Sequence, residues 1–273
     1  MTRPYIKKSS ANRLSERPRP GLQLGFPRLP EARSASHVTV ISQWLAQCDE
    51  GHKCFPDNIG FLPTRLINVG PLHSPTVRLV CGTAELGGRS TKYIALSHMW
   101  GTAHHKSLKT LRANVDGLKE WTIPVDALPR TFRDAVEITR SLGHQYLWID
   151  SLCIIQDDED DWRHESQRME EVFSSAYCVI AATCATGTND GFLKPRPERQ
   201  TVAMKDIQSG LPYYVCAAIN DFSGDVDGSE INSRGWVLQE RALARRTIHF
   251  TANQTYWECG TGVRCETLTR MKK

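Results

Sequence analysis

The stretch 146–156 constrains the fold of this chain more than any other feature. It is an apolar run, Tyr-Leu-Trp-Ile, that ends abruptly in Asp150 and continues as Ser-Leu-Cys-Ile-Ile-Gln, with five acidic residues directly after it. A short apolar run that stops at a polar turn is typical of a buried strand. We therefore expect a strand, a loop at its carboxyl end and then a helix that begins near Trp162. Such an arrangement favours a ligand site.

The order of the neighbouring segments predicts an α/β fold. Apolar runs at 93–97, 146–150 and 179–183 read as buried strands, and a helical pattern after Pro129 stops at Gly143. Alternation of strands and helices favours a mostly parallel sheet flanked by helices. Two further features are expected in addition to this sheet: a β-hairpin formed by 247–251 and 254–258, and short helical segments such as 38–47.

The segment from about 160 to 176 has the clearest helical pattern. At 100° per residue, Glu165 lies in the middle of an apolar stripe formed by Trp162, Met169, Val172, Phe173 and Ala176. Burying a carboxylate is costly unless the group is paired or used. Glu165 is therefore the strongest single candidate for a functional side chain.

Charge is distributed unevenly along the chain. Residues 1–36 carry eight Lys or Arg and two Glu, a net charge of +6, so that the remainder carries −2 of the total of +4. We expect this leader to be a disordered basic tail rich in Pro, Arg and Ser, and the nearly neutral remainder argues against specific nucleic-acid binding. The sequence offers no run long enough for a membrane span and no secretory signal, so we expect a cytoplasmic protein.

The nine cysteines are expected to be reduced thiols. Cys48, His52 and Cys54 stand close together, but this spacing is not usual for zinc and lacks a fourth ligand nearby. We therefore expect no metal. Neither a Walker-type phosphate loop nor a GxGxxG motif occurs, which argues against a tightly bound cofactor.

Several blocks resemble the fungal heterokaryon incompatibility (HET) domain. They are Tyr-Ile-Ala-Leu-Ser-His-Met-Trp-Gly at 93–101, Leu-Pro-Arg-Thr-Phe-Arg-Asp-Ala at 128–135, Leu-Trp-Ile-Asp-Ser-Leu-Cys-Ile-Ile-Gln at 147–156, Arg-Gly-Trp-Val-Leu-Gln-Glu-Arg at 234–241 and Tyr-Trp-Glu-Cys at 256–259. The blocks occur in matching order over about 38–260. One departure is His98, where Tyr is more usual.

The resemblance implies a domain organisation and a biological role. It divides the chain into a tail (1–36), a lead-in segment (37–92), the HET core (93–260) and a C-terminal tail (261–273). It implies a part in fungal non-self recognition, in which the domain triggers growth arrest or cell death. The family is distantly similar to Toll/interleukin-1 receptor (TIR) domains, which have a flavodoxin-like fold, and some TIR domains cleave NAD with a helix-borne Glu.

The resemblance and the strand ends together suggest a site. We predict Glu165 as the catalytic residue, with substrate-binding residues Ser97, Trp100, Gly101, Asp150 and Arg234. Ligands of open parallel sheets bind outside the carboxyl ends of strands, where Ser97 and Asp150 are expected. NAD would be a substrate, since a carboxylate stabilises the positive charge that develops on ribose as the nicotinamide bond breaks. Secondary candidates are Cys153, Gln239 and Glu240.

Structural roles remain open for the same residues. Glu165 could pair with Arg234 or Arg133, Asp150 could cap the following turn, and Cys153 and Trp100 could belong to the core. The chain is then either a NAD-hydrolysing signalling enzyme or a non-catalytic module that signals by self-association. Its partner would be another copy of itself or another incompatibility protein of the NLR type.

Overall fold

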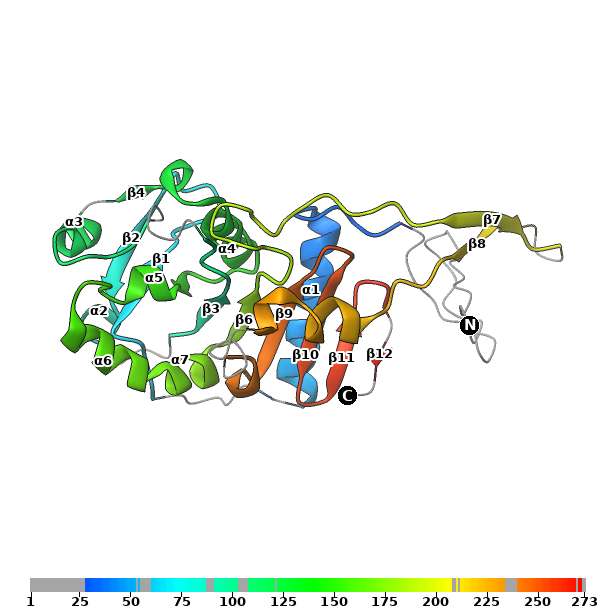
Figure 1. Ribbon diagram of the computed structural model, residues 1–273. Helices are drawn as coiled ribbons and strands as arrows, with labels where there is room; N and C mark the ends of the chain where they lie inside the picture. The colour runs from blue at the N-terminus through cyan, green and yellow to red at the C-terminus, as the bar shows by residue number, and fades with distance from the viewer. Residues whose placement is uncertain are drawn as a thin grey trace.

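A computed structural model describes residues 28–52, 54, 60–86, 91–102, 108–120, 122–207, 210, 212–233, 240–268 and 270–271. Figure 1 shows a large sheet that runs through the body of the molecule with helices packed against it. Among the described residues this sheet has ten strands, in the order β12-β11-β10-β9-β6-β3-β5-β1-β2-β4. The predicted α/β class is therefore confirmed.

The four central strands are parallel. They are β5 (Tyr146–Trp148), β3 (Tyr93–Ser97), β6 (Cys178–Ala181) and β9 (Arg246–Phe250). Nearly every residue in them is buried, as expected for strands that are covered on both faces. Among the described residues parallel pairing occurs only between these four strands, so the sheet as a whole is mixed.

Antiparallel strands extend the sheet on both sides. One side carries β1 (Arg65–Asn68), β2 (Thr76–Cys81) and β4 (Ile123–Pro124). The other side carries β10 (Thr255–Cys259), β11 (Gly262–Cys265) and β12 (Arg270–Met271).

Two sequence expectations concern the strands after β6. The predicted hairpin is confirmed as β9–β10. A tail was expected after residue 260, whereas β11 and β12 continue the sheet there, because alternate side chains such as Val263 and Cys265 pack into a small second core with Tyr256 and Val226.

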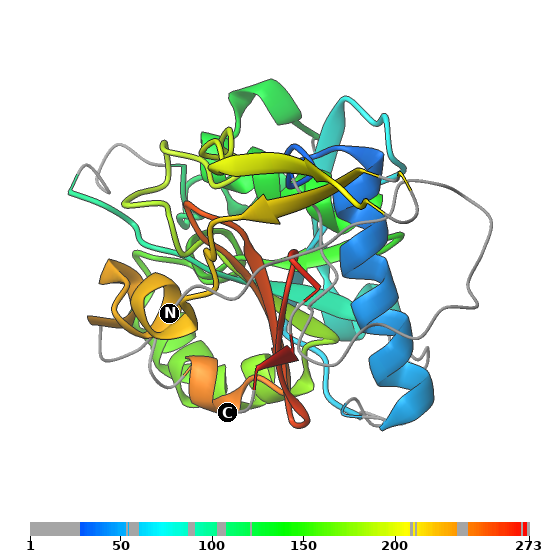
Figure 2. The same cartoon turned by 90° about the vertical axis from the view of Figure 1, so that its right-hand side faces the viewer.

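The helices cover the sheet on both faces. They are α1 (Ala35–Gly51), α2 (Gly82–Leu86), α3 (Val115–Glu120), α4 (Arg130–Ser141), α5 (Asp150–Cys153), α6 (Glu159–Gln167) and α7 (Met169–Ser175). Figure 2 shows α1 along one face of the late strands, with the short helical turns Ser223–Asp227 and Glu230–Ser233 on the opposite face. The expected stop of α4 is confirmed: Gly143 follows it with φ +77°.

The single helix predicted over 160–176 is wrong, because α6 and α7 are separated at Arg168. The backbone there has φ −99° and ψ 0°, outside the α-helical region. Arg168 donates a hydrogen bond to Thr64 Oγ1 (3.1 Å) and its guanidinium lies over the Phe61 ring. The break changes the helical phase, so Val172 and Phe173 reach the core while Trp162, which was expected in the same stripe, is 51% exposed.

Two strands form a separate small sheet. It consists of β7 (Thr201–Lys205) and β8 (Pro212–Cys216), and Figure 1 shows it projecting from the body of the molecule. Every residue of β7 is exposed. The strand expected over 211–219 is thus present, but it lies outside the main sheet.

Candidate functional site

Trp100 and Asp150 meet at the carboxyl end of the parallel strands. Trp100 follows β3 and Asp150 follows β5, and these strands are neighbours. The Trp100 indole N–H donates a hydrogen bond to Asp150 Oδ2 (2.7 Å), and the Ser151 N–H donates to Asp150 Oδ1 (2.6 Å). Two donors to one carboxylate hold it in a fixed orientation.

These two residues line a pocket of about 240 Å³. Its walls combine two indoles, two acidic groups, and smaller polar and apolar side chains: Trp100, Trp162, Asp150, Glu240, Gln156, Ser166, Ile154 and Met169. Aromatic and apolar walls with a few polar groups are typical of small-molecule sites. The volume is below the usual range for a drug-sized ligand, so the pocket suits a single ring.

His98 lies buried behind Asp150. Its Nδ1 is 3.9 Å from Asp150 Oδ1, and its ring packs edge-on against Phe132 with centroids 5.1 Å apart. Only 3% of His98 is exposed. The imidazole therefore packs as an aromatic ring in the core.

Glu165 does not line this pocket. It is 1% exposed, which confirms that it faces inward, and its Oε1 lies 3.8 Å from Arg65 Nη2. Arg65 also donates to the backbone oxygen of Cys153 (2.6 Å) and to Asp161 Oδ2 (2.5 Å). The alternative of a buried ion pair is thus the observed arrangement. The expected partners were Arg133 and Arg234; Arg133 is not the partner, and Arg234 lies outside the described residues.

Ser97 and Gly101 have structural positions next to the pocket. Ser97 is the last residue of β3, is 4% exposed, and accepts the Ala182 N–H through its backbone oxygen (2.9 Å). Gly101 has φ +75°, and a Cβ there would lie 3.0 Å from Gly187 Cα. Only glycine allows the two backbones to approach so closely. Neither residue lines the pocket.

Four predicted site residues remain: Cys153, Glu240, Arg234 and Gln239. Cys153 is fully buried, and burial raises the pKa of its thiol to about 12, which disfavours the thiolate that catalysis needs. Glu240 is 9% exposed and lines the pocket. Arg234 and Gln239 lie outside the described residues.

Comparison with known proteins supplies the family. Residues 93–240, more than half of the chain, match the model of the family described as heterokaryon incompatibility protein (HET). The chain belongs to the HET family. Every residue that lines the pocket lies within the matched segment, so the pocket is a feature of the HET domain itself.

One characterised relative is similar over part of the HET domain. The chain is 29% identical over 123 residues to heterokaryon incompatibility protein 6, OR allele, of Neurospora crassa. The similar region covers 42% of this chain and 18% of that protein, so the chain spans a small part of its relative. No solved structure matches the chain.

Sequence patterns missed five residues that line the HET pocket: Ile154, Gln156, Trp162, Ser166 and Met169. Trp162, Ser166 and Met169 lie on α6 and at the start of α7. Their spacing predicted that they belong to a helix, but not that they face a pocket. Arg65 was missed as the partner of Glu165, because it lies a hundred residues earlier in an unremarkable strand. Across the described part of the chain, no helix combines the length and hydropathy that crossing a bilayer requires.

Proposed function

We propose that this HET domain acts in the cytoplasm in fungal incompatibility, where it triggers growth arrest or cell death. We further propose that it does so by hydrolysing NAD at the pocket between Trp100, Asp150 and Glu240. The observation that supports the pocket is its composition: two indoles and two carboxylates around a space for one ring. The similarity of HET domains to TIR domains, some of which cleave NAD, supports the reaction by analogy.

The pocket chemistry fits the nicotinamide–ribose end of NAD. The nicotinamide ring of NAD⁺ is cationic, and Trp faces attract cations within about 6 Å of their centroid. A space of about 240 Å³ accommodates this ring, while the rest of the dinucleotide would extend from the open side. Trp100 is well placed for such stacking because its hydrogen bond to Asp150 fixes the indole plane.

The reaction transfers the ribosyl group to water. The bond between ribose C1′ and the nicotinamide nitrogen breaks, the electron pair stays on nicotinamide, and water adds to C1′ with loss of a proton. The ribose becomes positively charged as the bond stretches, and carboxylates nearby lower the free energy of that state. We assign this role to Glu240, and to Asp150 the binding of ribose hydroxyls. The role predicted for Glu165 moves to Glu240, because Glu165 faces Arg65 and Glu240 lines the pocket.

Nicotinamide release by the purified protein tests this proposal. We expect the wild type to release nicotinamide from NAD, and Glu240→Gln to lower the rate by about 100-fold or more. Glu170→Gln, an exposed position on α7, is the matched control and should keep the full rate. Full activity of Glu240→Gln, or loss confined to Glu165→Gln, would move the catalytic role away from Glu240.

A second candidate is a non-catalytic module that signals by self-association or through an NLR-type partner. The observation that favours it is the burial of Glu165 against Arg65, which gives this carboxylate a structural role. In that case assembled wild-type protein would leave NAD intact while still arresting growth.

A further inference from the structure

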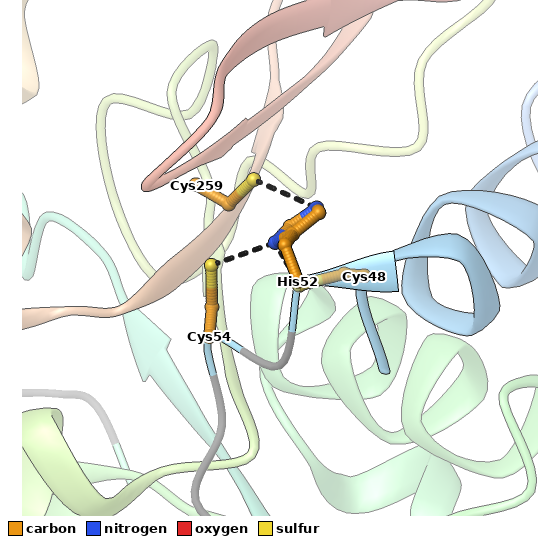
Figure 3. A group of neighbouring side chains, drawn as sticks. All are labelled: Cys48, His52, Cys54 and Cys259. Atoms are coloured by element: carbon orange, nitrogen blue, oxygen red, sulfur yellow. Dashed lines mark hydrogen bonds between the residues drawn. The ribbon is translucent and has the colours of Figure 1, made fainter. Parts of the chain in front are cut away.

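Four potential metal ligands from two distant parts of the chain lie together at the end of α1. Cys48 is in the last turn of α1, His52 caps that helix, Cys54 follows two residues later, and Cys259 is the last residue of β10. Their ligand atoms all lie within 4.8 Å of one another. Figure 3 shows the sulfurs of Cys54 and Cys259 on either side of the imidazole of His52, with Cys48 next to it at the end of α1.

The distances between these atoms are close to those of a tetrahedral zinc centre. Zn–S bonds of 2.3 Å and Zn–N bonds of 2.0–2.1 Å place neighbouring ligand atoms about 3.5 to 3.8 Å apart. His52 Nδ1 lies 3.1 Å from Cys54 Sγ and 3.6 Å from Cys48 Sγ, and His52 Nε2 lies 4.0 Å from Cys259 Sγ. Movements of about an ångström would complete the tetrahedron.

The surroundings of the cluster suit a closed structural site. Cys48 is fully buried and Cys259 is 4% exposed, while His52 and Cys54 are half-buried. The Thr261 hydroxyl lies 3.3 Å from His52 Nε2. If Nδ1 binds the metal, Nε2–H can donate to Thr261, and such a second hydrogen bond usually orients a ligating histidine.

A buried arginine, Arg246, lies on the strand that pairs with the one contributing Cys259. Three thiolates and a neutral imidazole around a divalent ion carry a net charge of −1. Arg246, which is 1% exposed, lies directly opposite Cys259 in the β9–β10 pairing. Its guanidinium forms an ion pair with Asp49 Oδ1 (2.5 Å), and Asp49 follows Cys48 directly in the last turn of α1.

We propose that Cys48, His52, Cys54 and Cys259 bind one structural zinc ion. Thiolate-rich tetrahedral sites select zinc, and four protein ligands leave no open position for catalysis. The expectation of no metal came from the lack of a fourth ligand near residues 48–54, and the fold supplies that ligand from β10. The ion would fasten the end of α1 to the sheet, and three of its four ligands precede the segment that matches the HET family. This proposal is independent of NAD hydrolysis.

The metal content of the full chain, purified without chelator, tests the proposal. We expect one zinc per chain in the wild type, and loss of most of it in Cys259→Ser. The matched control is Cys81→Ser, a half-buried free thiol on β2, which should keep the metal. His52→Cys should also keep it, because four thiolates form an equally good zinc site.

Cobalt binding provides a measurement that does not depend on any variant folding. Wild-type protein stripped of metal and titrated with Co²⁺ should develop the visible absorption bands of tetrahedral, thiolate-ligated cobalt, and added zinc should remove them. Absence of these bands together with less than a tenth of a zinc per chain would overturn the proposal. A disulfide between any two of the three cysteines in freshly purified protein would overturn it as well.

Discussion

At the scale of single residues, Arg65 connects the acidic helix to the sheet through three contacts. Its guanidinium reaches the backbone oxygen of Cys153, the carboxylate of Asp161 and the carboxylate of Glu165. Asp161 also accepts the Ile155 N–H (2.8 Å). Because Arg65 and Glu165 are both buried, removal of Arg65 leaves Glu165 without a compensating charge, whereas removal of Glu165 leaves Arg65 paired with Asp161.

Replacement of Arg65 tests this structural role. Arg65→Met should lower the free energy of unfolding by about 3–5 kcal/mol, since it leaves Glu165 buried beside an apolar side chain. The double variant Arg65→Met, Glu165→Met should recover much of that loss. Urea unfolding of both proteins gives the two values.

Arg78→Met is the control for this comparison. Arg78 pairs with Glu85 at the surface, where both side chains are more than one-third exposed, so its loss should cost less than about 1 kcal/mol. An equally small cost for Arg65→Met would show that Arg65 does not hold Glu165.

Sequence patterns predicted correctly that certain residues near the site are buried. They were less successful in predicting which residues face the pocket. The helical phase placed Glu165 inward correctly, because burial follows from periodicity. Its partner depended on a strand one hundred residues away, and such pairing leaves no local signal. Glu240 was named only as a secondary candidate, although it lines the pocket together with Trp100 and Asp150.

At the scale of elements, α1 is joined to the sheet by a buried polar network near its first turn. His37 is fully buried, and its Nε2 lies 2.9 Å from Thr255 Oγ1 and 3.2 Å from Glu266 Oε1. Arg196 Nη2 lies 2.9 Å from Glu266 Oε2. Burial, and then the nearby Arg196 charge, lower the pKa of the His37 imidazole to about 3.

The network predicts that the free energy of unfolding falls on acidification. The unfolded chain binds a proton at His37 below about pH 6.5, whereas the folded chain does not do so until about pH 3, so stability present above pH 6.5 is lost as the pH falls. Between pH 6.5 and 5 the wild type should lose about 2 kcal/mol more than His37→Gln does.

Urea unfolding at these two pH values, with both proteins, checks this expectation. Burial raises the pKa of Glu266 to about 7, so its contribution has the opposite sign and is lost as the pH rises from 4.5 to 7. Glu266 is present in both proteins, and its effect largely cancels in the difference. Parallel pH profiles for the two proteins would show that His37 is not held neutral.

Elements with a regular pattern were predicted well, and interruptions were not. The strands β3, β9 and β10 and the helix α4 lie within a residue or two of the predicted bounds. The break between α6 and α7 was missed, because no Gly or Pro marks it. The contact of Arg168 with Thr64 and Phe61 accompanies that break, and a single segment of sequence cannot show such a contact.

At the scale of the whole molecule, the mixed sheet brings the pocket residues together. The neighbouring parallel strands β3 and β5 deliver Trp100 and Asp150 to one edge, and α6 and α7 close the side of the pocket. The order of strands and helices predicted this edge, because parallel strands place their carboxyl ends together. Of the antiparallel additions, β10 was predicted as part of a hairpin, whereas β11 and β12 lie where a tail was expected.

The central claim is that the pocket drives an incompatibility response. The most direct test is to express the chain from an inducible promoter in a filamentous fungus and to measure growth. We predict that the wild type arrests growth and that Asp150→Asn and Glu240→Gln, at equal protein levels, restore it, whereas the exposed control Glu170→Gln arrests growth like the wild type. Arrest of growth by both pocket variants to the same extent as by the wild type would contradict the claim, and so would normal growth with the wild type.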